Sequence, residues 1–250
     1  LHFRAGQRAT LLSLGYEIPG GILKPVIDKQ HKRFSLSICL LALIKDARGE
    51  VAKKVSQEVP FSGALTGLES FARDAIIETQ PFILAPGRYT IESAVVSLGD
   101  NRASTMRTSL FVPGPAPLGV SDLVLVNSLE QQPRKEDARQ FDPLVSSLGK
   151  IRPELDPRLV AGSRAQIPIY FQVYANPAAP QPQVDVVITR DGTAPRTLSP
   201  NLLPAVAAGE QPYYAALDIG QLTPGNYVLR VTARQAGTSA EESLALEVAN

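Results

Sequence analysis

Apolar and polar residues alternate along much of the second half of the chain. The segment Ile167–Tyr174 has apolar side chains at its odd positions and Tyr170, Gln172 and Tyr174 at its even positions. A period of two is typical of a strand with one buried face, so both tyrosines are expected on the exposed face. Further strands of this kind are predicted within residues 184–188, 213–219, 227–234 and 242–248.

The first half of the chain has its own set of predicted strands. Phe34–Ile44 is largely apolar, and Arg48-Gly49 is a turn signal that precedes Val51–Val59. Short strands separated by turn signals about every ten residues favour an all-β fold, here tandem β-sandwiches of immunoglobulin or fibronectin III type. The next two predicted strands are Tyr89–Leu98 and Thr105–Val112.

One segment departs from the strand pattern. Thr66-Gly-Leu-Glu69 has the spacing of a capping box, and Leu65, Leu68 and Phe71 follow a helical stripe. We therefore expect a short helix across residues 67–75.

Two short motifs occur twice, in the same order. Leu84-Ala-Pro-Gly-Arg-Tyr89 returns as Leu222-Thr-Pro-Gly-Asn-Tyr227, and Ala5-Gly-Gln-Arg-Ala9 returns as Ala161-Gly-Ser-Arg-Ala165. Two copies of one module with a loop-length difference would produce this spacing. The sequence therefore predicts a duplicated module.

A run rich in proline and glycine lies between the copies, at residues 113–119. Such a run continues neither a strand ladder nor a helix, so we interpret it as the joint between domains. The predicted boundaries are a first sandwich at 1–114, a joint and connector at 115–158 with a strand near 120–127, and a second sandwich at 159–250. A charge cluster at 134–137 is expected to be a solvated loop.

The repeated Leu-x-Pro-Gly-x-Tyr motif has a physical interpretation. Proline fixes φ and glycine accepts positive φ, which suits a tight turn. The leucine before the turn can enter the core, and the tyrosine hydroxyl can bond a backbone group, as in the tyrosine corner of β-sandwiches. The predicted corner residues are Leu84, Pro86, Gly87 and Tyr89, and Leu222, Pro224, Gly225 and Tyr227.

Several segments together resemble a known family: Ile151-Arg-Pro153, Leu159–Gly162, Ile169–Tyr174, Val186–Ile188 with Arg190-Asp-Gly192, Leu222–Tyr227 and Val120–Leu125. They are similar to the C-terminal region of secreted acidobacterial proteins related to von Willebrand factor A-type domain proteins, and to the tails of bacterial GWxTD-domain proteins. The resemblance covers most of residues 80–250 and implies β-sandwich modules at an extracytoplasmic site. The A-type domain itself is missing, because the chain has no Asp-x-Ser-x-Ser motif.

Composition excludes several classes of protein. Apolar residues make up 44% of the 250, charged residues 20%, and the formal net charge is +1, so neither general disorder nor bulk electrostatic binding to nucleic acid is expected. No apolar run is long enough to span a membrane. The single cysteine excludes an intrachain disulfide and a multi-cysteine metal site. Residue 1 is Leu rather than Met, so we expect a processed chain or a fragment.

Signals for catalysis and cofactors are weak. We expect His2 at a frayed start, His31 in a solvated basic loop, and Cys39 as a small buried hydrophobe in a strand. Nucleotide-binding glycine motifs and the zinc-protease motif do not occur, so no cofactor is expected. Calcium in an interdomain loop stays open, although the candidate carboxylates are scattered at Asp185, Asp191 and Asp218.

Two sets of surface residues are candidates for partner binding. Residues 1–114 hold 14 Lys+Arg against 10 Asp+Glu, about +4, and the basic loop could contact an anionic surface or keep a sheet edge soluble. Tyr170 and Tyr174 are expected to point outward, as is one of the adjacent pair Tyr213 and Tyr214, and exposed tyrosines suit protein or carbohydrate contacts. The candidates are Lys29, Lys32, Arg33, Tyr170, Tyr174, Tyr213 and Tyr214.

The pattern as a whole favours a non-catalytic structural or protein-interaction module of a secreted or cell-envelope protein. It would act by surface docking, self-assembly or edge-strand pairing. A carbohydrate-binding accessory module is the first alternative, and the lack of Trp counts against it. An enzyme with a site at the domain joint is the second.

Overall fold

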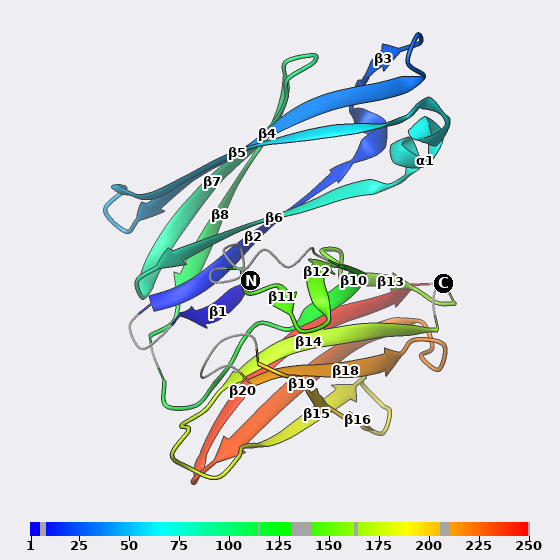
Figure 1. Ribbon diagram of the computed structural model, residues 1–250. Helices are drawn as coiled ribbons and strands as arrows, with labels where there is room; N and C mark the ends of the chain where they lie inside the picture. Colours follow the sequence, from blue (N-terminus) through cyan, green and yellow to red (C-terminus); the bar gives the residue numbers. More distant parts are fainter. Residues whose placement is uncertain (6–8, 115, 132–141, 163–164, 206–210, 250) are drawn as a thin grey trace. The chain divides into compact units, whose positions relative to one another are not determined.

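The computed structural model describes residues 1–5, 9–114, 116–131, 142–162, 165–205 and 211–249 (Figure 1). Strands form 65% of it and helices 5%, which confirms the all-β prediction. The chain divides into two compact units. The N-terminal unit comprises residues 16–80 and 84–114, and the C-terminal unit comprises residues 1–15, 81–83 and 115–250.

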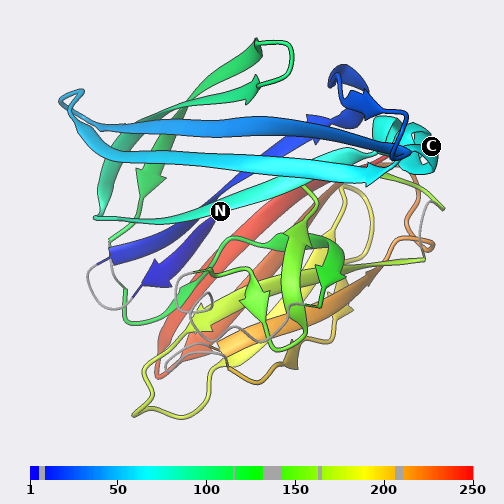
Figure 2. The same cartoon turned by 45° about the horizontal axis from the view of Figure 1, so that its top comes forward.

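One large antiparallel sheet dominates the N-terminal unit. In it β5, β4, β7 and β8 lie side by side, and the short β3 pairs with the start of β4 (Figure 2). The strands β2 and β6 belong to a second sheet. The elements are β2 (Ala9–Pro19), η1 (Gly20–Ile22), β3 (Val26–Asp28), β4 (Arg33–Asp46), β5 (Val51–Ala64), η2 (Leu65–Gly67), α1 (Leu68–Arg73), β6 (Ala75–Leu84), β7 (Gly87–Ser97) and β8 (Arg102–Val112).

Alternation along β4 builds the core of this unit. Ile38, Leu40, Ala42 and Ile44 are all at most 2% exposed, whereas the residues between them face outward or are half-buried. The sequence predicts a largely apolar strand over residues 34–44, and in the structure its residues alternate between the core and the outer face.

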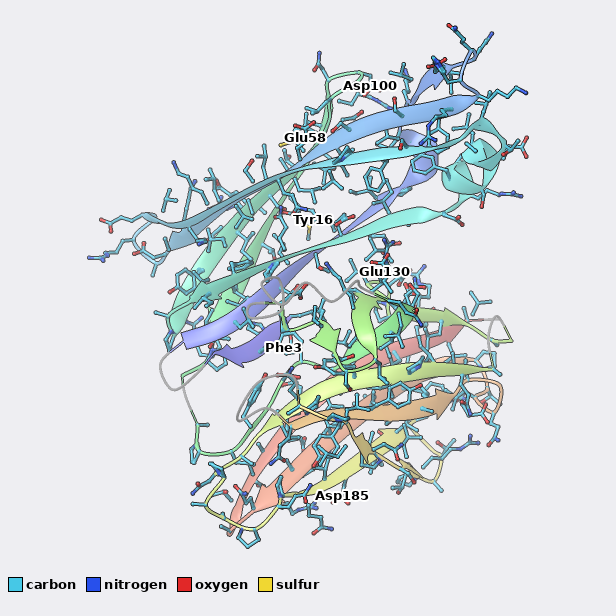
Figure 3. All side chains as sticks on the ribbon, in the orientation of Figure 1. Phe3, Tyr16, Glu58, Asp100, Glu130 and Asp185 are labelled. Atoms are coloured by element: carbon cyan, nitrogen blue, oxygen red, sulfur yellow. The ribbon has the colours of Figure 1, made fainter. Side chains whose placement is uncertain are left out.

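Tyr16 of β2 connects the second sheet to this one. Its side chain is labelled in Figure 3, and its hydroxyl shares one proton between two acceptors, Oε1 of Gln80 at 3.1 Å and the backbone oxygen of Leu41 at 3.3 Å. Burial raises the pKa of this phenol to about 12, because the charged phenolate would lose its hydration.

The predicted helix is present but shorter than 67–75. It runs from Leu68 to Arg73, its N-cap is Gly67, and no side chain caps it, so the expected capping box is wrong. The apolar stripe is correct in outline, because Leu68 and Phe71 are half-buried. The Phe71 ring lies 5.2 Å from that of Phe34.

The C-terminal unit is a sandwich of two larger sheets. One has the order β11-β12-β10-β14-β18-β17, with β9 also paired to β14, and the other has the order β13-β20-β19-β15-β16. Ile167, Ile169 and Phe171 of β14 pack in one core with Leu229 and Val231 of β19. The elements are β1 (His2–Ala5), β9 (Gly119–Val120), β10 (Val124–Glu130), β11 (Val145–Ser146), β12 (Gly149–Pro153), β13 (Arg158–Val160), β14 (Gln166–Tyr174), β15 (Gln183–Thr189), β16 (Arg196–Leu198), β17 (Asn201–Leu202), β18 (Gln211–Asp218), β19 (Gly225–Gln235) and β20 (Thr238–Ala249).

The domain boundaries differ from the predicted ones in two places, although the division at 114/115 is the same. Residues 1–15 group with the C-terminal unit rather than with the first sandwich. The segment 115–158, expected as a connector, supplies β9–β12 to a sheet of the C-terminal unit. The reason is that β10 buries both faces: Leu125 enters the main core and Val124 enters a second one. The predicted loop at 134–137 lies outside the described residues.

Both copies of the Leu-x-Pro-Gly-x-Tyr motif make the same hydrogen bond. The hydroxyl of Tyr89 donates to the backbone oxygen of Ala85 at 2.9 Å, and that of Tyr227 donates to the backbone oxygen of Thr223 at 2.7 Å. In each case the acceptor lies four residues before the tyrosine. The predicted tyrosine corner is therefore present twice.

The buried leucine and the place of the following strand in its sheet also correspond between the two corners. Leu84 and Leu222 are buried at 5% and 7% exposure, as predicted. After Pro86 and Pro224, β7 starts at Gly87 between β4 and β8, and β19 starts at Gly225 between β15 and β20. Gly225 has a φ of +150°, whereas Gly87 needs no positive φ.

Duplication of an ancestral module stays a prediction. The second repeated motif, at 5–9 and 161–165, lies partly outside the described residues, which omit 6–8 and 163–164.

Candidate interaction surface

Tyr170 and Tyr174 were both expected at the surface, together with one of the adjacent pair Tyr213 and Tyr214, but Tyr170 and Tyr174 are buried. Tyr170, Tyr174 and Tyr213 are 2%, 6% and 5% exposed, and only Tyr214 is half-buried. The expectation of an exposed face on β14 is wrong because this strand is central and its second face is also covered. Tyr170 belongs to a separate core cluster that includes Phe3 of β1.

The polar groups of β14 form a buried hydrogen-bonded chain. The hydroxyl of Tyr174 donates to Oε1 of Gln172 at 2.8 Å, and Nε2 of Gln172 donates to the hydroxyl of Tyr170 at 2.8 Å. The Tyr170 hydroxyl in turn donates to the backbone oxygen of Pro143 at 3.4 Å. Residues 166–174 contain no charged side chain, and this was the available signal that both faces of the strand are covered.

The predicted basic residues lie at the tip of the β3–β4 hairpin. Lys29, Lys32 and Arg33 are all exposed. His31 is exposed as expected, and its Nδ1 lies 2.7 Å from a carboxylate oxygen of Asp28. Hydrogen bonds from the His31 backbone and side chain hold the pKa of Asp28 below its usual range.

The other candidate catalytic residues occupy unrelated places. His2 is not frayed, because it lies in β1 with Nδ1 3.0 Å from Asp122. Cys39 is half-buried rather than buried, and it lies on the face of β4 opposite to the core. Among the described residues, no group of three or more His, Cys, Asp and Glu could hold a metal ion. Helices long and apolar enough to cross a membrane do not occur in the described part of the chain.

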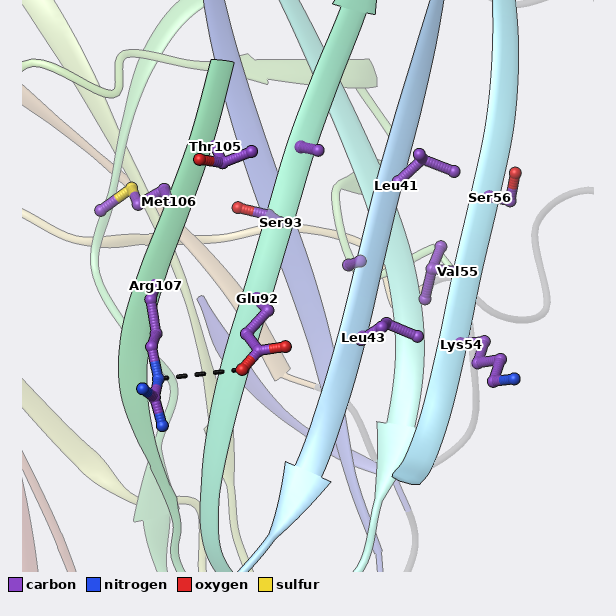
Figure 4. A pocket seen from close by; sticks show the side chains of 12 residues that line it. Leu41, Leu43, Lys54, Val55, Ser56, Glu92, Ser93, Thr105, Met106 and Arg107 are labelled. Atoms are coloured by element: carbon purple, nitrogen blue, oxygen red, sulfur yellow. Dashed lines mark ion pairs between the residues drawn. The ribbon is translucent and has the colours of Figure 1, made fainter. Parts of the chain in front are cut away.

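A surface that the sequence analysis missed is the outer face of the β5-β4-β7-β8 sheet. Leu41 and Leu43 of β4, each 37% exposed, lie opposite Ala94 and Glu92 of β7. A shallow groove of about 630 Å³ runs across this part of the sheet (Figure 4). The core of the sheet lies beneath, so this apolar strip is additional to what the fold requires.

Charged residues border the apolar strip. Glu92 accepts a hydrogen bond from Nζ of Lys45 at 2.6 Å. Its carboxylate also lies 3.9 Å from Nε of Arg107 (Figure 4). The hydrogen bond from Lys45 is the main reason that the pKa of Glu92 is lowered. An apolar centre with a polar rim is the usual anatomy of a protein-binding surface.

The two edges of this sheet differ in chemistry. The β5 edge carries Lys53, Lys54 and Pro60, which are the residues that commonly prevent a sheet edge from pairing with another chain. In the described residues β8 pairs only with β7, it has eight consecutive exposed residues, and it contains no Lys or Pro. Met106 on this strand is 66% exposed. The β8 edge is thus the unprotected one.

Comparison with known proteins adds little. No family model matches the chain, and no curated protein is similar to it. Among solved structures it is similar to ICAM-5 ectodomain D1–D4 (13% identity, TM-score 0.31, 94% of this chain and 53% of that one). It is also similar to red sea bream transglutaminase (10% identity, TM-score 0.27, 100% of this chain and 31% of that one). A third similar structure contains fibronectin(III)-like modules of Clostridium thermocellum CbhA (12% identity, TM-score 0.23, 90% of this chain and 95% of that one). Scores this low carry no argument about function, and the fold assignment rests on the strand pairings above.

Proposed function

We propose that this chain is a non-catalytic interaction module of a secreted or cell-envelope protein, which assembles through the β8 edge of its N-terminal unit. The observation that carries the proposal is the contrast between the two edges of one sheet. A strand added along β8 would satisfy backbone donors and acceptors that now face solvent. It would also lie beside the groove, because Thr105 and Arg107 of β8 border it.

The partner that we propose is a second copy of this chain. In an antiparallel pairing with two-fold symmetry, a register centred on Thr108 sets Met106 opposite Leu110 of the other copy, and the reverse. It also sets Arg107 opposite Ser109 rather than opposite Arg107 of the second copy. Apolar pairs and the lack of directly opposed like charges both favour strand pairing.

The alternatives have less support. A sugar-binding row of aromatic side chains would need exposed rings, but Tyr170, Tyr174 and Tyr213 are buried. An enzyme would need a nucleophile beside a base, but each candidate has a partner or a place of its own: His2 beside Asp122, His31 beside Asp28, and Cys39 on the outer face of β4. The resemblance to secreted acidobacterial proteins supports an extracytoplasmic site.

Sedimentation velocity of the purified chain tests the proposal. Edge pairing buries a small area, so we expect dimers to appear with rising concentration between about 1 µM and about 200 µM. Met106→Lys places a charge on the exposed β8 edge and should abolish the dimer without affecting the fold. Ser56→Lys adds the same charge to exposed β5 and should leave the dimer intact. A wild-type monomer throughout this range, or equal effects of the two variants, would refute the proposal.

A further inference from the structure

One end of the N-terminal unit exposes large aliphatic side chains that no core requires. Ile22, Val26, Ile27 and Leu98 are 55%, 63%, 39% and 44% exposed. They belong to two adjoining segments, since the Arg102 side chain, which follows the β7–β8 turn, donates to the backbone oxygen of Ile22. Such clustering on a soluble domain indicates a surface that is covered in use.

Cations surround these apolar residues. Lys24, Lys29, Lys32 and Arg33 are exposed on the same hairpin and its approach. Three nearby carboxylates already have a side-chain partner: Asp28 is hydrogen-bonded to His31, Asp100 pairs with Arg102, and Asp74 accepts a hydrogen bond from Ser70. The fourth, Glu69 of α1, is exposed. Residues 22–33 therefore carry four cations and one carboxylate.

We infer that this β3–β4 tip binds an anionic lipid surface. Val26 is paired with Ser35 and Ile27 with Phe34, so the two aliphatic residues point to opposite faces of the hairpin. The exposed cations beside these aliphatic side chains favour an anionic lipid interface as the occupant, because such an interface accepts apolar and cationic side chains together. Lysine stems can lie along the apolar layer while their ammonium groups reach lipid phosphates. The site is separate from the β8 edge and does not depend on it.

The expected strength follows from the charges. A basic side chain near an anionic membrane changes affinity about five-fold, so neutralising two lysines should weaken binding about 30-fold. Added salt should weaken it further, because the attraction is screened.

Vesicle flotation tests the inference with the whole chain. The protein should float with phosphatidylcholine vesicles that contain phosphatidylglycerol and should not float with phosphatidylcholine alone. The double variant Lys24→Gln with Lys29→Gln should weaken vesicle binding about 30-fold. The matched control is Lys53→Gln with Lys54→Gln on exposed β5, which removes the same charge and should leave flotation unchanged.

A second variant tests the apolar contribution. Ile22→Ser with Val26→Ser alters only exposed positions, so it should fold normally and bind less at every salt concentration. Equal flotation with neutral vesicles, equal losses in the control pair, or unchanged binding of the serine variant would overturn the inference. Binding to polyglutamate without binding to vesicles would also overturn it, and would indicate an acidic protein instead.

Discussion

The two tyrosine corners provide a test of how its surroundings set the value of the corner hydroxyl. Tyr89→Phe and Tyr227→Phe each remove only a hydroxyl, and the two bonds to a backbone oxygen have the same sequence separation. The Tyr227 hydroxyl also lies 3.4 Å from Oγ1 of Thr223, so Tyr227→Phe removes this contact as well. The two corners differ in environment: the bond of Tyr89 is exposed, whereas Tyr227 is 7% exposed and its bond is partly buried. The contact of Arg190 with the Tyr227 ring, at 5.7 Å, survives in phenylalanine.

The expected magnitudes follow from what replaces each lost bond. Water can reach the backbone oxygen of Ala85, so Tyr89→Phe should lower the free energy of unfolding by about 0.5 kcal/mol. The backbone oxygen of Thr223 is less accessible, so Tyr227→Phe should cost about 1–2 kcal/mol.

Equilibrium urea unfolding followed by circular dichroism measures both values. Tyr214→Phe is the control, since the Tyr214 side chain is half-buried and its hydroxyl has no hydrogen-bond partner among the described residues. It should change the free energy of unfolding by less than about 0.5 kcal/mol. The reasoning fails if Tyr89→Phe costs as much as Tyr227→Phe, or if both match the control.

Three other predictions concern single sites. Gly20→Ala should destabilise the N-terminal unit by about 3 kcal/mol or more in thermal unfolding, because its Cβ would lie 1.9 Å from the backbone oxygen of Phe71; Gly67→Ala, with open space around it, should be tolerated. The pKa of Tyr16 is raised from 10.0 to about 12, so its protonated form contributes stability below pH 10 that is lost as the pH rises toward 12. Phenolate absorbance should therefore show one tyrosine that titrates late, and Tyr16→Phe should remove this step. A tyrosine titration that is complete near pH 10 would contradict the assignment. Gln172→Leu should cost about 1–3 kcal/mol, because two buried phenols each lose one hydrogen-bond partner; an unchanged urea midpoint would show that water replaces the amide.

Local patterns were sufficient to predict most strands and both corners. The apolar run over residues 34–44 corresponds to β4 (Arg33–Asp46), and the alternation over 227–234 corresponds to β19 (Gly225–Gln235). Both depend on neighbouring residues in sequence, and a tyrosine that bonds a carbonyl four residues earlier is equally local. Such features need no knowledge of what lies across the sheet.

The exposure of a strand's second face could not be predicted in the same way. The even positions of β14 are polar enough to suit solvent, yet β1 and the segment that follows residue 118 cover them. These covering segments are distant in sequence from β14. An alternating pattern was interpreted as a strand with one buried and one exposed face, and this interpretation failed where a later or earlier part of the chain covers the second face.

The outer face of the N-terminal sheet also could not be predicted from local pattern, but here the residues are apolar and exposed rather than polar and buried. Leu41 and Leu43 belong to a run of apolar residues, which is typical of a strand buried on both faces, but no layer of the described residues covers them. In β14 polar residues are covered, and in β4 apolar residues are exposed. Folding alone explains the first case, because every buried hydroxyl and amide named above has a partner. Folding does not explain the second, since exposed leucines give the isolated chain no stability. A contact outside the chain would account for the unprotected edge, and this is why the proposed assembly is placed on β8 rather than on the tyrosines.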